Sequence, residues 1–359
     1  MSAIYSIITG TGSYIPPRCI RNEDFLENEF FDKDGRLINR SNQDIIQKFQ
    51  EITTIAERRY AEDNEVTSDL AFRAAVQAIK SADIDKEQLD YIIVAHNFGD
   101  LRKGHCHVDI VPTLAARVKH LLTIKNPNCI AYDLPFGCPG WLQAVIQADY
   151  YLKSGDASKI LVIGAEVLSR IFDPHDRDCM LYSDGAGAVI LEAIRSDQPK
   201  GILAHKTRSD TITHANMLFM GNSYKSEDQN CDKTYLKMHG RKLYQYALEH
   251  VPMAIKDCIA KANMSIHAVK KVLIHQANGK MDEAILNRLY ALFDIYSPPE
   301  DIMPMSINKL GNSSVATVPT LLDLILRNKL GTHTIDKGDV IVFASVGAGM
   351  NINSVVYQY

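Results

Sequence analysis

Short continuous apolar runs alternate along the chain with longer segments in which apolar residues recur every three or four positions. Runs such as 160–164 and 340–344 are typical of strands that are buried on both faces of a sheet. The helical spacing predicts helices over 66–80, 141–152, 238–261 and 319–328. The alternation of the two kinds of segment predicts an α/β fold.

The pattern occurs twice along the chain. A helix tail, a polar turn and an apolar strand at 82–94 recur 180 positions later at 262–274. The apolar strand at 160–164 recurs at 340–344 with the same offset. One match between short apolar runs is common by chance, but two matches in the same register favour an internal duplication. We therefore expect two similar α/β halves.

Two stretches, 25–42 and 205–233, are polar and rich in turn-forming residues, and neither is of low complexity. We interpret both as surface excursions rather than as linkers between independent domains.

Composition narrows the class of protein. With 359 residues and 46% hydrophobic content the chain can bury a large core, while a net charge of −4 provides no general basic field for nucleic acid or anionic membranes. Seven cysteines without paired spacings indicate a reducing compartment rather than a disulfide framework. The N-terminal residues lack a signal-peptide pattern, and no run approaches a membrane span. We expect a soluble cytoplasmic protein without nucleic-acid or membrane partners.

Cys138 lies between an apolar strand-like run and an apolar helix-like run. A thiol at the start of a helix faces unpaired N–H groups and the positive end of the helix dipole, which favours the thiolate. This effect is expected to bring the thiol pKa from about 8.5 toward neutrality, as suits a nucleophile. The alternative is a structural cysteine, since free cysteines are among the most buried residues.

Three further motifs follow predicted strands or precede predicted helices. His275 comes directly after the strand 272–274, where α/β sheets usually present ligands. Asn312 lies in a Gly-Asn-Ser-Ser loop before a helix, and 345–349 is a glycine-rich segment with sparsely covered N–H groups. Each has a structural alternative, a packed histidine or an ordinary turn.

Together these residues point to acyl-thioester chemistry. A cysteine nucleophile needs donors for the oxyanion that forms when it attacks a thioester carbonyl. If a second thioester then becomes a carbon nucleophile, its oxygen gains enolate charge, and a neutral His275 and the Asn312 amide would supply donors to that oxygen.

The motifs resemble, in order, those of β-ketoacyl-acyl-carrier-protein synthase III of the thiolase superfamily, over nearly the whole chain. The matching segments are 137–140, 173–177, 183–188, 275–278, 311–314 and 347–349. The resemblance implies a thiolase-like fold with two duplicated βα halves in a layered α-β-α-β-α arrangement. Residues 1–200 would form the half with the nucleophile, and 201–359 the half with the histidine and asparagine.

The resemblance also assigns roles. It implies Cys138 as the acylated nucleophile, with His275 and Asn312 stabilising the enolate. The backbone N–H groups of Cys138 and Ala348 would form an oxyanion hole. It also implies that Arg177, Gly347 and Gly349 bind the substrate and its pantetheine arm. The family implies a homodimer with a pantetheine tunnel and no cofactor.

Some positions depart from the family pattern. Glu57-Arg58-Arg59 is present, but Lys48 stands where the resemblance places a tryptophan that clamps adenine. Arg177, which matches a nucleotide-side arginine, is retained. We therefore expect acyl groups delivered on a carrier protein more than on coenzyme A. Lys280 aligns with a basic position at the tunnel mouth that would meet the acidic carrier, although a solvated surface lysine is the alternative.

The segment after His96 is also unusual. His105, Cys106, His107 and Asp109 are metal-ligating types, but adjacent side chains seldom converge on one ion, so we expect no metal and a role in shaping the acyl pocket. With the 25–42 excursion, this segment resembles specialised synthases that join two acyl chains into cyclohexanedione or resorcinol precursors.

The sequence therefore predicts a Claisen-type acyltransferase that condenses an acyl group on Cys138 with a malonyl or β-ketoacyl thioester. A thiolase is one alternative, but it needs a second cysteine near the C-terminal glycine-rich loop, and none follows Cys258. A non-catalytic partner of a condensing heterodimer is another, but such subunits often lose the nucleophile.

Overall fold

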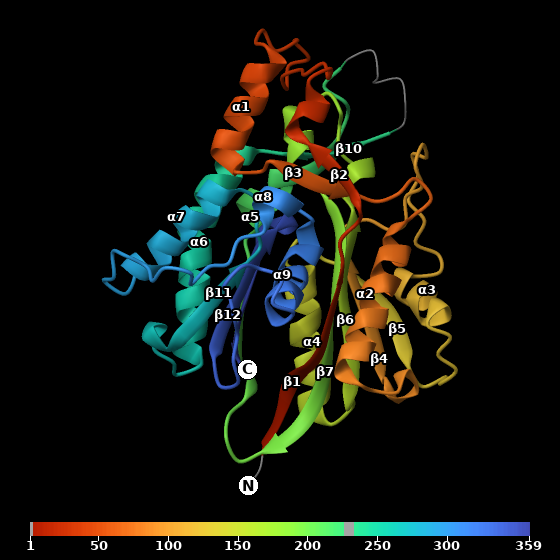
Figure 1. Ribbon diagram of the computed structural model, residues 1–359, viewed down its shortest axis with the longest axis vertical. Helices are drawn as coiled ribbons and strands as arrows, with labels where there is room; N and C mark the ends of the chain where they lie inside the picture. The colour runs from red at the N-terminus through yellow and green to blue at the C-terminus, as the bar shows by residue number, and fades with distance from the viewer. Residues whose placement is uncertain (1–2, 226–232) are drawn as a thin grey trace.

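The computed structural model describes residues 3–225 and 233–359. Two sheets form the centre of the described chain (Figure 1). The first sheet has the order β1 (Ala3–Tyr14), β7 (Asp184–Ser196), β6 (Lys159–Val167), β4 (Tyr91–His96) and β5 (Ile130–Pro135). The second has the order β11 (Val269–Ile274), β12 (Val340–Gly347), β13 (Asn351–Gln358) and β8 (Gly201–Ser209).

Helices fill the layers around the sheets. The outer face of the first sheet packs on α2 (Thr67–Ala82) and α3 (Leu114–Leu121), and that of the second on α6 (Gly240–Lys261) and α7 (Gly279–Ala291). The inner faces share one apolar core with α4 (Gly140–Ser154) and α9 (Thr317–Leu326). The expected α/β class and its layered α-β-α-β-α arrangement are confirmed (Figure 1).

Burial explains why the apolar runs are continuous. Eight of the nine residues of β6 and all eight of β12 are buried, since both strands lie between helix layers. Nine of the ten residues of α9 are buried, which matches its place between the sheets. None of the helices within the described residues is long and apolar enough to cross a membrane.

The repeated segments occupy equivalent places in the two sheets. β4 pairs in parallel with β6, and β11 pairs in parallel with β12. The antiparallel strands β7 and β13 follow in the same positions. The duplication read from the sequence therefore corresponds to two sheets of similar topology, while a division of the chain at residue 200 stays a prediction.

The predicted helices are confirmed within two residues at each end. The prediction that 205–233 is a surface excursion is wrong in part. Residues 205–209 continue β8, and the stretch also holds α5 (Thr211–His214) and β9 (Leu218–Gly221), while 226–232 lie outside the described residues. The polar end of β8 is compatible with a strand because β8 is an edge strand with one exposed side.

Several elements near one end of the molecule were not predicted. They are α1 (Asn42–Thr53), β2 (Arg18–Arg21), β3 (Glu57–Tyr60), β10 (Tyr235–Met238) and α8 (Ile307–Leu310). The 25–42 stretch lies at this end, ahead of α1, and is largely exposed, as expected of an excursion.

A buried carboxylate connects the middle helix layer to the first strand. Asp323 of α9 accepts hydrogen bonds from Thr11 at 2.7 Å and Ser13 at 2.6 Å, and pairs with Arg327 at 2.7 Å. Its side chain is only 1% exposed, so its charge depends on these partners.

We expect Asp323→Ala to lower the free energy of unfolding by about 3 kcal/mol or more, because it leaves buried donors and the Arg327 charge without their acceptor. The matched control is Asp257→Ala, which removes an exposed aspartate on α6 and should change stability by less than about 0.5 kcal/mol. Urea denaturation of both variants measures the difference. Equal midpoints would contradict the role given to Asp323.

Candidate active site

Cys138 lies in the short connection between β5 and α4, two residues before the helix begins. Gly137, in the left-handed region at φ 78°, makes the turn, and the Gly140 N–H donates to its carbonyl at 2.9 Å. The end of β12 passes directly over this turn. A Cβ on Gly347 would lie 2.7 Å from the Cys138 nitrogen, so only glycine allows the approach.

The thiol is less acidic than its position at a helix start suggests. Although part of Cys138 contacts solvent, the protein surrounds its sulfur, and this desolvation raises the pKa of the thiol to about 11. A hydrogen bond from Ser314 opposes the shift. The expectation of a pKa near neutrality is therefore wrong for the free protein, because desolvation outweighs the helix start.

Ser314 lies beside Cys138, and Asn312 is held next to Ser314. The Ser314 hydroxyl donates to Cys138 Sγ at 3.2 Å, and the Ser314 N–H donates to Asn312 Oδ1 at 2.8 Å. Because its oxygen is already engaged, Asn312 can offer its amide N–H groups to a ligand. Gly311, at φ 62°, turns the chain into this loop against the side chain of the fully buried Arg58.

His275 follows β11, where its N–H donates to Ala344 of the neighbouring β12 at 2.9 Å. His275 thus lies at the carboxyl end of β11, on the side toward which the parallel strand β12 continues to Gly347. Burial lowers the pKa of His275 to about 4, so the ring is neutral at neutral pH. Gln276 fixes the next loop by accepting from Ser306 at 2.9 Å and Ile307 at 3.1 Å.

The glycine-rich tail is adjacent to the nucleophile. Ala348 begins a 3-10 turn after β12, and a Cβ on Gly137 would lie 3.0 Å from the Ala348 nitrogen. The structure thus brings the backbone of Ala348 to the Cys138 turn. Gly349 adopts φ 75° and allows the chain to reverse into β13.

The remaining predicted residues lie apart from Cys138. Lys280 is exposed at the start of α7, which packs on α1, where Lys48 is also exposed and pairs with Glu51 at 3.1 Å. Arg177 is exposed at the start of a 3-10 helix, two residues before the buried Cys179. Among the described residues, no hydrogen bond or ion pair connects these cations to the thiol.

The loop after β4 does not assemble a metal site. Asp109 is held by Arg117 at 2.7 Å, and the same arginine bonds Asp100 at 2.7 Å. Among the described residues, no three His, Cys, Asp or Glu side chains converge as metal ligands.

A buried acid and its neighbours behind Cys138 were not predicted. Glu166, near the end of β6, is fully buried, and burial raises its pKa to about 7. It accepts from the Asn97 side chain at 2.7 Å. Burial opposes charging of the nearby His96, but Asp133, 3.2 Å away, and Glu166 outweigh burial and raise the His96 pKa. The sequence did contain a signal for this buried acid, because Glu166 is a glutamate within an apolar strand.

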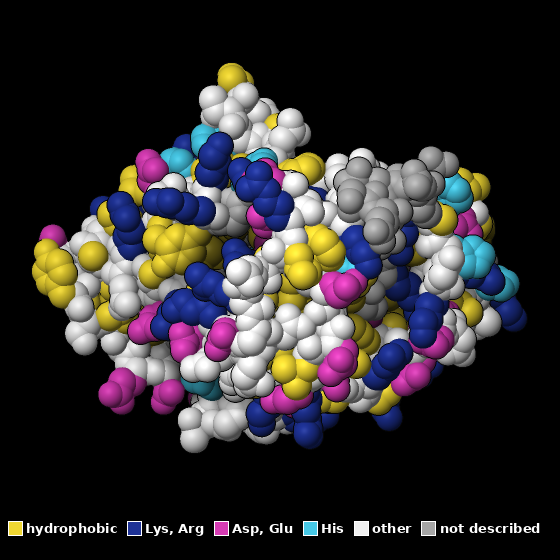
Figure 2. All heavy atoms as spheres, turned by 90° about the horizontal axis from the view of Figure 1, so that it is seen from above, with side chains coloured by type: hydrophobic (Ala, Val, Ile, Leu, Met, Phe, Trp, Pro, Cys, Tyr) yellow, Lys and Arg dark blue, Asp and Glu magenta, His cyan; other side chains and the backbone are white. Residues whose placement is uncertain are grey.

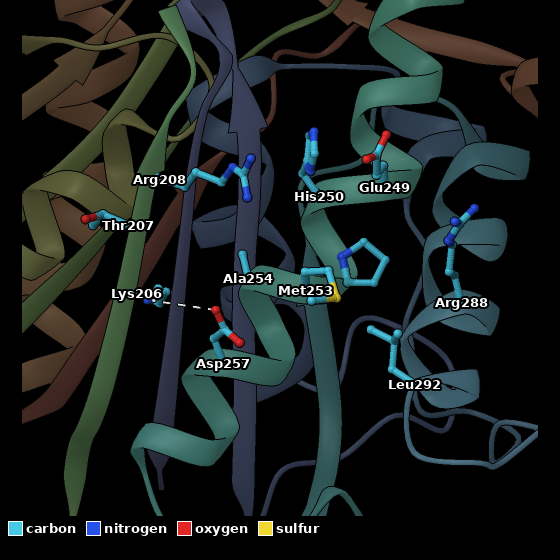
Figure 3. A pocket seen from close by; sticks show the side chains of 11 residues that line it. Lys206, Thr207, Arg208, Glu249, His250, Met253, Ala254, Asp257, Arg288 and Leu292 are labelled. Carbon is cyan, nitrogen blue, oxygen red and sulfur yellow. Dashed lines mark ion pairs between the residues drawn. The ribbon is translucent and has the colours of Figure 1, made fainter.

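A surface pocket of about 520 Å³ lies elsewhere, between β8, α6 and α7 (Figure 3). Arg208, His250 and Arg288 line it together with apolar groups such as Met253. None of its lining residues contacts the Cys138 turn, so the pocket is separate from the candidate active site.

Comparisons with known proteins cover the same residues. The family model described as 3-oxoacyl-[acyl-carrier-protein (ACP)] synthase III matches residues 132–211, which include Cys138. The model described as its C-terminal part matches 259–359, which include His275 and Asn312.

Full-length relatives agree with these matches. The β-ketoacyl-[acyl-carrier-protein] synthases III of Bradyrhizobium sp. strain BTAi1 and Xanthomonas oryzae pv. oryzae are 30% and 31% identical, each over 99% of both chains. The crystal structure of 3-oxoacyl-[acyl-carrier-protein] synthase III from Aquifex aeolicus VF5 is 30% identical with a TM-score of 0.78, over 99% of this chain and 100% of that one.

We expect the pKa of the buried His275 to lie below the ordinary histidine value and that of the buried His96 to lie above it. With ¹³C-labelled imidazoles, the His275 signal should stay that of a neutral ring down to about pH 5, whereas His96 should gain its proton above about pH 6.5. The variants His275→Gln and His96→Gln assign the two signals. A His275 signal that titrates between about pH 6 and 7 would contradict its desolvation.

Proposed function

Since the chain belongs to the 3-oxoacyl-[acyl-carrier-protein] synthase III family and is a Claisen-condensing acyltransferase, we propose that Cys138 is its acylated nucleophile. We assign His275 and Asn312 to the carbon–carbon bond-forming step. The observation that carries the proposal is the meeting of separate loops at the Cys138 sulfur, with Ser314 at 3.2 Å and Gly347 against its backbone.

In the first half-reaction the Cys138 thiolate attacks the carbonyl carbon of an acyl thioester. A sulfur–carbon bond forms, the tetrahedral oxyanion collapses, and the donor leaves as a thiol that carries the proton lost by Cys138. The backbone N–H groups of Cys138 and Ala348 are the proposed donors to the oxyanion, because the two segments are in contact through Gly137 and Gly347.

In the second half-reaction a malonyl thioester loses carbon dioxide, or a β-ketoacyl thioester gives its α-proton to a base from the solvent, to form an enolate. Its carbon attacks the acyl group on Cys138, and the cysteine leaves as thiolate. A neutral His275 and the amide N–H groups of Asn312 suit the enolate oxygen, since both can donate hydrogen bonds to it while they remain uncharged.

The alternatives fit less well. A thiolase would need a second cysteine at the glycine-rich tail, where the chain has Gly347, Ala348 and Gly349 and no cysteine follows Cys258. A non-catalytic subunit would have no need of the nucleophile, which is retained at Cys138.

We propose a carrier protein as the main acyl donor. Lys and Arg side chains stand out on the end of the molecule that carries α1 (Figure 2). Lys48 and Lys280 are exposed where α1 packs on α7, and they are suited to the acidic surface of a carrier. Lys48 also replaces the aromatic group that would hold adenine, which favours a carrier over coenzyme A. Arg177 is then a rim residue for the phosphate of the pantetheine arm.

We also propose a homodimer. The edge strand β5 is unpaired on one side within the described chain, and its Ile130 is 50% exposed. Val111 and Ile110, in the loop between β4 and α3, are 82% and 52% exposed. Pairing of β5 with a second copy would cover this edge and these apolar side chains.

A reaction whose product joins two acyl chains is the specialised alternative to the function proposed above. It is supported by the unusual loop at 97–109.

We expect wild-type protein incubated with acyl-carrier and acyl-coenzyme A thioesters to gain the mass of one acyl group, and Cys138→Ala to gain none. Intact-protein mass spectrometry measures both. Cys106→Ala, which removes an exposed cysteine, is the matched control and should acylate like wild type. An undiminished adduct on Cys138→Ala, or no adduct with any donor, would refute the assignment.

We expect Asn312→Ala to retain acylation of Cys138 but to condense about 10²–10³-fold more slowly, because one donor to the enolate is lost. Single-turnover assays that follow the acyl adduct and the condensed product separately measure the two steps. Loss of acylation in a folded Asn312→Ala protein would show that Asn312 acts earlier.

A further inference from the structure

A row of hydrogen bonds runs from the first sheet to the Cys138 sulfur. The Asn97 side-chain nitrogen donates to Glu166 Oε1 at 2.7 Å and to Ser314 Oγ at 2.8 Å. Ser314 Oγ in turn lies 3.2 Å from Cys138 Sγ. Neither Asn97 nor Ser314 takes a part in the reaction steps described above, yet both are placed against the nucleophile.

The direction of each hydrogen bond follows from the one before it. Glu166 Oε1 accepts the Asn97 backbone N–H and so presents its lone pairs to this residue, which turns the NH₂ group of the Asn97 side chain toward the same oxygen. That NH₂ group has no acceptor capacity, so Ser314 Oγ must accept from it. The hydroxyl hydrogen of Ser314 is then left to point at the next acceptor, the sulfur of Cys138.

We infer that Asn97 and Ser314 are positioning residues that hold a hydroxyl hydrogen on the Cys138 sulfur and so stabilise its thiolate before the acyl donor binds. This inference rests on the proposed role of Cys138 as nucleophile. Glu166 acts one step further back, as the acceptor that orients Asn97.

The backbone shows that Ser314 is held in place. Its φ of 53° lies in the left-handed region, which is uncommon for a residue other than glycine and persists where the surroundings require it. The next residue, Val315, lies on β6 so closely that a Cβ on Gly164 would be 2.4 Å from its carbonyl oxygen. From this position Ser314 orients two groups at once, the sulfur of Cys138 and the amide of Asn312.

Other charges near the row act on the same thiol. A negative Glu166 disfavours the thiolate, whereas the Ser314 hydrogen bond favours it. His96 lowers the pKa of Glu166 and Asp184 raises it, and the charge of a Cys138 thiolate would raise the pKa of Tyr182. Because these groups and their partners stay in place in a Ser314 variant, a shift in the titration of Cys138 in that variant reports the missing hydrogen bond. Loss of the Asn97 side chain also removes a donor that holds the pKa of Glu166 down.

The test is the pH profile of alkylation by iodoacetamide, followed on the Cys138 peptide by mass spectrometry with the exposed Cys106 as internal reference. Ser314→Gly suits the positive φ and removes only the hydroxymethyl group. It should slow alkylation of Cys138 at neutral pH by roughly 10-fold or more and move the profile to higher pH. Ser313→Ala, which lacks the neighbouring hydroxyl, should leave the profile unchanged.

Asn97→Ala frees the Ser314 hydroxyl to turn, so it should slow alkylation in the same direction by roughly 3-fold. The double variant should be no slower than Ser314→Gly, because both act through one hydrogen bond. An unchanged profile in folded Ser314→Gly, or additive effects in the double variant, would overturn the inference. If Ser314→Gly does not fold, an unchanged profile in Ser314→Ala overturns it.

This assay needs no acyl donor, so it is independent of the acyl-adduct test. A shifted alkylation profile without any acyl adduct would refute the proposed function and leave the positioning of the thiol standing. An acyl adduct on Cys138 with unshifted profiles in the variants would do the reverse.

Discussion

The close approach of β12 to the start of α4 is the constraint on which the site depends. Gly347 lies against the backbone of Cys138 at a distance that leaves no room for a side chain. Because β12 belongs to the second sheet and Cys138 follows a strand of the first, this contact joins the two duplicated halves at the nucleophile, as the hydrogen bond from Ser314 also does. Any residue larger than glycine would separate the thiol from the Ala348 backbone.

The topology explains why residues distant in sequence meet there. In each half, parallel strands end on the same side of the sheet, and the loops that leave them carry Asn97, Cys138 and His275. Duplication places two such ends next to each other, with α4 and α9 between the sheets. The site is therefore a consequence of how two similar halves pack, and neither half contains it alone.

The sequence predicted the elements in which apolar residues recur regularly and the site residues that lie in recognisable motifs. α2, α4, α6 and α9 were found because their apolar spacing is regular, whereas the polar end of β8 and α1, whose residues are mostly polar, were not. Cys138, His275 and Asn312 follow from recognisable segments. The bonds from Asn97 to Glu166 and Ser314 join positions 69 and 217 apart, and no local pattern reveals such pairs.

The same physical cause sets the protonation of the two central groups. Desolvation raises the pKa of the Cys138 thiol to about 11 and lowers that of the His275 ring to about 4, so both are neutral at rest. A neutral imidazole suits donation to an enolate, but a neutral thiol is a poor nucleophile. Burial therefore favours the second half-reaction at the expense of the first. The Ser314 hydrogen bond stabilises the Cys138 thiolate, which burial destabilises. This is the physical reason for a hydroxyl group in contact with the cysteine of this site.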